Sequence, residues 1–309
     1  MSSVASDPAL IGLDWGTSSF RAHLLDREGL VLDCRSSDKG IMQIRDCDFE
    51  AELHRQVAVW AKWRDLPIVA SGMIGSRNGW METPYIEAPA QVDTLAGALT
   101  TRTTSQGYRV HLVPGVKAEH GGAPDVMRGE ETQILGAVDT GMNENLFVLP
   151  GTHSKWIRVN KGCIEGFSTF MTGEMFSLLR SHSVLGKLMD DEDASFSKKG
   201  FLSGVNAGLE AGQDLLHRLF RVRTLPLFDI IDKSMVSDYL SGLLIGAEIA
   251  SPLARGRETC TGVAVMCRDD LAQRYEVALG VAGIPCTRVP DNVVSRGHIA
   301  IARAAGLIP

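Results

Sequence analysis

Two segments with the same pattern constrain this chain more than any other feature. Each reads as a short apolar strand, a Gly-Thr turn, a second strand, a turn containing Gly and a third strand. The first segment covers residues 10–35 and the second covers residues 146–167. A three-stranded meander repeated at this distance is too widely spaced for a solenoid. We therefore expect two similar domains that face each other across a cleft.

The first Gly-Thr turn has the composition of an anion site. Asp14 ends the first strand, and Gly16, Thr17 and Ser18 follow it. Such a turn presents backbone N–H groups to an anion, and Gly16 lets a phosphate approach the backbone closely. A carboxylate at the end of a strand can hold a hydrated Mg²⁺. The alternative is an ordinary hairpin turn, since turns are rich in Gly, Ser and Thr.

Composition excludes several classes of protein. A length of 309 residues is enough for two domains, and a net charge of −6 argues against a nucleic-acid-binding surface. Six scattered cysteines without a C-x-x-C pair indicate reduced thiols and no zinc site. The chain shows no signal peptide, no 18-residue apolar run, and neither a Walker nor a G-x-G-x-x-G motif. We expect a soluble cytoplasmic protein.

Several motifs resemble known families. The pattern Asp14-x-Gly16-Thr17-Ser18 and the later Gly151-Thr152 resemble the phosphate-1 and phosphate-2 motifs of the actin/hexokinase/Hsp70 superfamily. More narrowly, the chain resembles 2-dehydro-3-deoxygalactonokinase in the motifs MRGEETQILGA, LPGTHSKW, MTGE and YLSGLLIGAEIA. The resemblance runs over nearly the whole chain.

The resemblance implies a fold. It predicts an α/β protein with two ribonuclease-H-like (actin-like ATPase) domains, each a mixed sheet with helices, flanking a central cleft. The domains are expected at residues 8–142 and 143–309, and the last helix is able to pack back on the first domain.

The resemblance also implies a nucleotide site for ATP. Expected phosphate-binding residues are Gly16, Thr17, Ser18, Gly151, Thr152, His153 and Lys155, and expected adenosine-binding residues are Gly242, Gly246 and Cys267. For His153 the alternative is a turn residue hydrogen-bonded to the backbone. Gly242 and Gly246 lie four residues apart on one helix face, so close helix–helix packing is the other reading of that pair.

A Gly-rich loop is the expected sugar-acid site. It spans residues 72–89 and follows a short buried strand, where α/β sheets bind ligands. An Arg fork suits a carboxylate, an Asn suits hydroxyls, and an aromatic ring covers an apolar face. The alternative is a surface loop. Expected substrate contacts are Ser76, Arg77, Asn78, Trp80 and Tyr85, with Arg128 steadying a phosphate or the substrate carboxylate.

Glu130 is the expected general base, together with Asp14 as a catalytic and metal-binding residue. Glu130 and Glu131 fall in the first turn of a predicted helix, where the helix dipole favours an ionised carboxylate. Glu131 and Asp125 remain alternatives for the base. The alternative without a catalytic role is that Glu130 and Glu131 only interact favourably with the helix dipole.

The expected activity is ATP- and Mg²⁺-dependent phosphorylation of 2-dehydro-3-deoxy-D-galactonate on its 6-hydroxyl. Neither the preferred C4 epimer nor the oligomeric state follows from the sequence, although a homodimer is possible; no nucleic-acid or membrane partner is expected. The alternatives are a kinase for another small sugar, sugar acid or pantothenate, and a non-catalytic actin-like nucleotide-binding protein.

Overall fold

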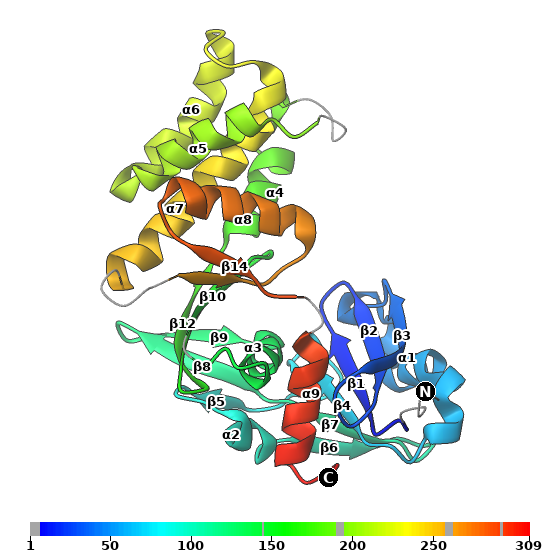
Figure 1. The fold of residues 1–309 in the computed structure, drawn as a ribbon. Coiled ribbons are helices and arrows are strands. Elements are labelled where there is room, and N and C mark those ends of the chain that lie inside the picture. Colours follow the sequence, from blue (N-terminus) through cyan, green and yellow to red (C-terminus); the bar gives the residue numbers. More distant parts are fainter. Residues whose placement is uncertain (1–6, 144, 190–194, 257–261, 291–292) are drawn as a thin grey trace, which may run out of the picture. The chain divides into compact units, whose positions relative to one another are not determined.

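The computed structural model describes residues 7–143, 145–189, 195–256, 262–290 and 293–309 (Figure 1). Contacts divide the chain into two compact units. The first comprises Met1–Glu144, Val159–Gly166 and Asn292–Pro309, and the second comprises Asn145–Arg158 and Phe167–Asp291. These units differ from the expected domains, 8–142 and 143–309, because the last helix and residues 159–166 make their contacts within the first unit.

The main sheet of the first unit has the strand order β3-β2-β1-β4-β7-β6. β1, β4 and β7 run parallel to one another, and β2, β3 and β6 are antiparallel to their neighbours. The predicted first meander is confirmed as β1–β3. The strands are β1 Leu10–Trp15, β2 Phe20–Leu25, β3 Val31–Ser37, β4 Ile68–Ser71, β6 Thr100–Thr103 and β7 Arg109–Leu112.

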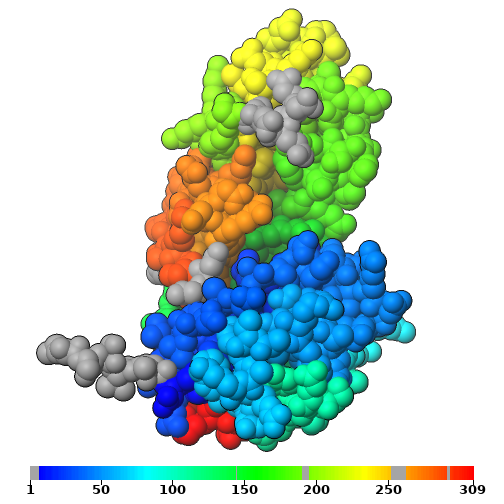
Figure 2. Space-filling model, turned by 90° about the vertical axis from the view of Figure 1, so that its right-hand side faces the viewer, coloured from blue at the N-terminus to red at the C-terminus, as the bar shows by residue number. Residues whose placement is uncertain are grey.

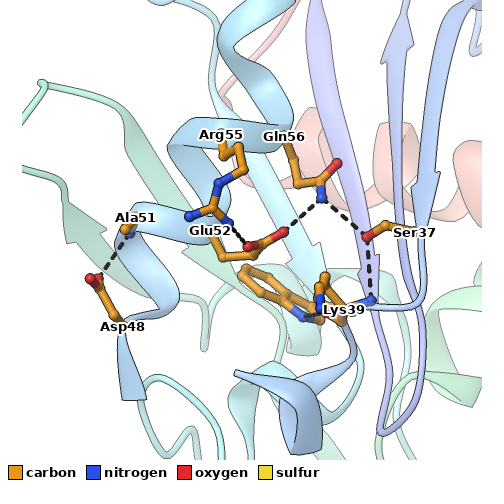
Figure 3. Close-up of polar contacts among 8 residues, drawn as sticks. Ser37, Lys39, Asp48, Ala51, Glu52, Arg55 and Gln56 are labelled. Carbon is orange, nitrogen blue, oxygen red and sulfur yellow. Dashed lines mark hydrogen bonds and ion pairs between the residues drawn. The ribbon is translucent and has the colours of Figure 1, made fainter. Parts of the chain in front are cut away.

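Helix α1 (Phe49–Val57) covers this sheet and is fixed by side-chain caps. The Asp48 carboxylate accepts a hydrogen bond from the Ala51 N–H at 3.0 Å, which satisfies one of the free donors of the first turn. Buried Glu52 accepts bonds from Arg55 and Gln56, and Gln56 donates to the Ser37 hydroxyl at 3.1 Å (Figure 3). The helix is therefore tied to the end of β3.

A smaller sheet and three helices complete the first unit. Its strand order is β5-β8-β9, with β5 parallel and β9 antiparallel to β8. The strands are β5 Tyr85–Glu87, β8 Gly115–His120 and β9 Ala123–Met127, and the helices are α2 Val92–Ala96, α3 Glu130–Asp139 and α9 Val293–Ala304.

Helices α3 and α9 lie side by side with their backbones in contact (Figure 1). A Cβ added at Gly136 would lie 1.8 Å from the Val293 carbonyl oxygen, and one at Gly297 would lie 1.9 Å from the Thr132 carbonyl oxygen. Only glycine permits this approach. The contact places the last helix of the chain against the helix that begins at Glu130.

The second unit is built on a sheet with the order β12-β11-β10-β13-β14, although residues 159–166, at the end of β11 and the start of β12, group with the first unit. β10, β13 and β14 are parallel, and β10–β12 confirm the predicted second meander. The strands are β10 Asn145–Leu149, β11 Ser154–Asn160, β12 Cys163–Phe170, β13 Val263–Val265 and β14 Cys286–Arg288. The helices are α4 Thr172–His182, α5 Lys198–Leu209, α6 Leu215–Leu227, α7 Val236–Gly256 and α8 Asp269–Val281.

Helix α6 is only half covered. Leu219 and Val222 are buried, while Leu216 is 84% exposed and Phe220 is 59% exposed. The segment around α6 lies on the surface that Figure 2 shows in yellow. Within the described ranges, no helix is long and apolar enough to span a bilayer.

The α3–α9 contact predicts a large cost for one methyl group. Gly297→Ala forces a Cβ into the Thr132 carbonyl, so we expect about 1–3 kcal/mol of destabilisation from overpacking, read as a lower Tm. Gly280→Ala is the matched control, since Gly280 is an exposed position of α8 and a Cβ there meets no atom within 4 Å. That control is expected to be neutral or slightly stabilising. An unchanged Tm for Gly297→Ala would contradict the packing described here.

Candidate active site

The carboxyl ends of β1 and β4 bring the first group of predicted residues together. Asp14 pairs with Ser71 across these parallel strands. Gly72 follows β4 with φ +94°, and a Cβ there would lie 2.7 Å from the Trp15 carbonyl oxygen and 3.4 Å from the Asp14 carboxylate. A Cβ on Gly129 would lie 3.1 Å from the Gly72 Cα. The backbone after β4 is therefore in contact with the residue that precedes α3.

Burial and neighbouring charges of both signs affect the pKa of Asp14. Burial raises the pKa of its carboxyl group, the neighbouring Arg21 lowers it, and the charge of Glu130 raises it. Glu130 is partly exposed, and its Oε2 accepts a hydrogen bond from the Arg128 N–H at 3.0 Å. Through the backbone contact of Gly72 with Gly129, the start of α3, which carries Glu130, lies beside the strand end that carries Asp14.

Glu131 has a different environment from Glu130. It is completely buried, and its carboxyl oxygens accept bonds from the Gly129 N–H at 2.6 Å and the Thr132 hydroxyl at 3.2 Å. Burial, followed by the charge of Glu130, raises the pKa of Glu131 to about 7. The side chain folds back on its own helix start, as a carboxyl cap does.

The first Gly-Thr turn is open to solvent and rigidly backed. Thr17 and Ser18 are exposed. Behind them, Gly16 and Thr17 accept backbone bonds from Ile41 at 3.0 Å and Met42 at 3.2 Å, and a Cβ at Gly40 would lie 2.4 Å from the Ser18 nitrogen. This support holds the turn in one conformation while its outer side stays accessible.

The Gly-rich loop uses its predicted residues in different ways. Ser76 donates to the Met73 carbonyl at 2.7 Å, and Trp80 packs against the core of the first unit with the Arg102 guanidinium over its ring. Arg77 and Asn78 are exposed. Ser76 and Trp80 thus shape the loop, and Arg77 and Asn78 lie on its solvent side.

Tyr85 and Arg128 come together. The Arg128 guanidinium lies 4.4 Å from the centre of the Tyr85 ring and donates to the Thr83 carbonyl at 3.0 Å and to the Thr83 hydroxyl. Arg128 is only 7% exposed, and its Nε has no hydrogen-bond partner within the described ranges. A Cβ at Gly75 would lie 3.0 Å from the Arg128 Nη1, so the loop closes directly over the guanidinium.

The second Gly-Thr turn is framed by the start of α4. A Cβ on Gly173 would lie 2.2 Å from the Gly151 carbonyl oxygen, and the Glu174 N–H donates to the Thr152 carbonyl at 2.9 Å. The His153 ring pairs with the Glu174 carboxylate. Gly151, Thr152 and His153 are exposed, whereas Lys155 is 5% exposed. The alternative expectation for His153 is a hydrogen bond to the backbone of the turn. In the structure its ring instead pairs with the Glu174 side chain.

The expected adenosine contact at Gly242 and Gly246 needs correction. Added Cβ atoms would lie 2.2 Å from the Phe201 carbonyl oxygen and 2.4 Å from that of Val205, both on α5. The glycine face of α7 is therefore filled by another helix, and the packing alternative holds. Cys267 is the second residue after β13, and the Met266 N–H between them donates to the Val148 carbonyl at 2.9 Å. It lies at the same sheet edge as the Gly151 turn.

Sequence reasoning missed three polar residues. Thr83 carries no motif signal, and Glu174 was visible only as a letter of MTGE. Glu248 is an acidic residue within the apolar stretch LLIGAEIA, a pattern that could have indicated a buried polar contact. In the described part of the chain, no group of three or more His, Cys, Asp or Glu residues gathers to ligate a metal.

Comparison with known proteins finds a matching family and close relatives over nearly the whole chain. It matches the family described as DGOK: 2-keto-3-deoxy-galactonokinase over residues 14–301. It is 37% identical over 295 residues to a Rhizobium meliloti (strain 1021) protein named as a probable 2-dehydro-3-deoxygalactonokinase, covering 94% of this chain and 96% of that protein. It is 33% identical over 298 residues to the Escherichia coli (strain K12) 2-dehydro-3-deoxygalactonokinase, covering 95% of this chain and 97% of that one.

A solved structure gives the same result. A Sinorhizobium meliloti crystal structure, assigned as a 2-dehydro-3-deoxygalactonokinase protein, superposes with a TM-score of 0.88 at 37% identity. The match covers 96% of this chain and 98% of that one. The predicted α/β class, with two ribonuclease-H-like domains of the actin-like ATPase type, is confirmed by these mixed sheets and relatives. The chain belongs to the 2-keto-3-deoxy-galactonokinase family.

Proposed function

We propose that this chain transfers the γ-phosphoryl group of ATP to the 6-hydroxyl of 2-dehydro-3-deoxy-D-galactonate. The product is the 6-phosphate of the sugar acid. The observation that carries the proposal is the backbone contact that places the start of α3, with Glu130, beside the strand end that carries Asp14, in a chain of this kinase family. In phosphoryl transfer the protein acts mainly by positioning the reactants and stabilising charge, and it does little covalent chemistry itself.

Glu130 is the proposed base. Its carboxylate accepts the proton of the 6-hydroxyl, the hydroxyl oxygen forms a bond to the γ-phosphorus, and the bond to the β–γ bridging oxygen breaks, releasing ADP. Glu130 is partly exposed, and its charge acts on Asp14, whereas Glu131 is buried and its oxygens accept hydrogen bonds. Asp125, the third candidate, lies in β9 and accepts from the Val126 N–H.

Phosphate donors are proposed in each unit separately. In the first unit they are the exposed backbone and hydroxyls of Gly16, Thr17 and Ser18, and in the second Gly151, Thr152, His153 and Lys155. Exposed turns with glycine offer N–H groups to phosphate oxygens. Cys267 is retained as a contact for the adenosine, since it follows β13, which is the parallel neighbour of the strand β10 that leads into the Gly151 turn.

Asp14 fits the metal that such kinases use. Its carboxyl group is partly buried, and both this burial and the negative charge of Glu130 raise its pKa, an effect that a bound cation opposes. Mg²⁺ keeps several waters and needs only one or two carboxylates besides the substrate phosphates. When bound, Mg²⁺ would neutralise the charge of the phosphate oxygens, and Asp14 would hold it in place.

The substrate carboxylate is proposed to bind Arg128. Within the described ranges, the contacts of this buried guanidinium are to uncharged partners, Thr83 and Tyr85, and its Nε is unpaired. A buried cation is stabilised by an anion that pairs with it. Tyr85 then covers the sugar chain, with Ser76, Arg77, Asn78 and Trp80 of the same loop placing its hydroxyls.

A coupled ADP-release assay tests the proposed activity. We expect turnover with 2-dehydro-3-deoxy acids, and the panel includes both C4 epimers because the two differ by one hydroxyl. Neutral sugars and pantothenate are expected to be poor substrates because they lack the carboxylate of a sugar acid or its hydroxyl pattern. Equal turnover of a neutral sugar would favour another kinase specificity, and nucleotide binding without any turnover would favour a non-catalytic protein. Sedimentation of the same samples measures whether the protein is a homodimer.

Glu130→Gln tests the base. The amide keeps an oxygen that can accept the Arg128 N–H but cannot take a proton, so we expect kcat to fall about 10²–10⁴-fold with ADP affinity retained. Exposed Glu28→Gln is the control and should keep full turnover. Near-normal turnover of Glu130→Gln would move the role to Glu131 or Asp125.

Glu131→Gln tests the buried carboxyl through the pH dependence of stability. The folded pKa of about 7 lies above the unfolded value of 4.5, so folding stability is lost as pH rises from about 4.5 to 7. The amide does not titrate. We therefore expect the stability of the variant relative to the wild type to rise between pH 4.5 and pH 8, by up to about 3 kcal/mol, with turnover retained. Denaturant unfolding at both pH values measures this, and a pH-independent difference would contradict it.

A further inference from the structure

Glu248 is a buried carboxyl group with donors on every side. It lies in α7, is 3% exposed, and has no role in the proposed chemistry. Its Oε1 accepts from the Ser154 hydroxyl at 2.7 Å and the Trp156 indole N–H at 2.8 Å, and its Oε2 accepts from the Tyr275 hydroxyl at 2.8 Å. The Thr172 hydroxyl is a fourth donor. A carboxylate offers about four lone-pair sites, so the set of donors matches the group.

Two of these donors belong to the segments that form the second Gly-Thr turn. Ser154 is the first residue of β11 and directly follows His153. Thr172 is the first residue of α4, whose Gly173 and Glu174 contact the backbone of Gly151 and Thr152. One carboxyl group therefore binds both sides of the turn, while Trp156 and Tyr275 hold that carboxyl group in place.

We propose that Glu248 is a positioning residue for nucleotide binding, acting through Ser154 and Thr172 on the Gly151–His153 turn. The inference rests on the proposed function, in which this turn binds phosphate oxygens. A turn that must present several N–H groups to one anion loses affinity when its conformation is free to vary, because ordering it then costs free energy on binding. The carboxylate removes that cost by fixing both flanks beforehand.

The same helix offers a matched control. Asp238 is also a buried carboxylate of α7, bound to the Ser197 N–H at 2.6 Å and to Arg274 at 2.7 Å. It lies ten residues before Glu248, about 15 Å along the helix axis. Asp238→Asn removes a buried charge from the same helix without touching the turn. It therefore measures how a general loss of stability affects ADP binding.

The test is the dissociation constant of ADP with Mg²⁺, measured by calorimetry on the full chain. We expect Glu248→Met, which keeps the volume and removes every acceptor, to weaken ADP binding at least tenfold. KM for the sugar acid should change less than threefold. Glu248→Gln keeps one acceptor oxygen and should recover most of the affinity. Asp238→Asn should bind ADP as the wild type does, even where its Tm is lower.

Ser154→Ala provides a second, independent variant. It leaves the carboxylate in place and removes only the contact beside the turn, so it should weaken ADP binding about threefold to tenfold, and its effect should not add to that of Glu248→Met. If Glu248→Met does not fold, Ser154→Ala decides the question. Wild-type-like ADP affinity in the folded variants, or an equal loss in Asp238→Asn, would overturn the inference. Absence of ADP binding by the wild type would instead overturn the proposed function.

Discussion

The bare-backbone contact between α3 and α9 is the constraint on which the first unit depends. Gly136 and Gly297 let the two helices approach until carbonyl oxygens occupy the places of Cβ atoms. The same α9 helix packs His298 against Gly12 of β1 and Ser71 of β4, and its Nε2 lies 2.9 Å from the Ser71 hydroxyl. Burial lowers the pKa of His298 to about 3, so the ring stays neutral at physiological pH. The last helix thus locks both the sheet edge and the helix that carries Glu130.

Glycine performs the same task in the second unit. Gly204 and Gly208 of α5 face Gly242 and Gly246 of α7, and added Cβ atoms at all four would collide with backbone of the facing helix. These glycines bring α7 and α5 into backbone contact, and Glu248 follows two residues after Gly246. Gly242 and Gly246, the expected adenosine contacts, are therefore packing positions. The nearby Glu248 makes the contact to Ser154, beside the Gly151 turn.

Buried charged groups lie beside both Gly-Thr turns and the sugar-acid loop, and the surroundings of each differ. Glu248 has four donors, Glu131 has bonds from its own helix start, and Arg128 retains an unpaired Nε. A buried charge that is fully bonded stabilises local geometry, whereas one that is incompletely bonded has capacity for a ligand. This difference separates residues that hold the site from residues that are proposed to act in it.

The sequence by itself determined the two meanders, the fold class and the family, because those depend on local turn chemistry and on motifs that are contiguous in the chain. It also identified Asp14, Glu130, Tyr85 and Arg128 as residue types suited to the chemistry. Only the tertiary structure decided that α9 belongs with the first unit, that Gly242 and Gly246 pack on α5, and that Glu248 reaches Ser154. These facts depend on which helix fills the space beside a glycine, or which donor meets a buried oxygen. The residues involved are 41 apart for Gly242 and Phe201, 94 apart for Ser154 and Glu248, and 165 apart for Thr132 and Gly297. No local pattern encodes such a partner, since the same glycine pair serves a helix or a flat ligand equally well until the neighbouring element is in place.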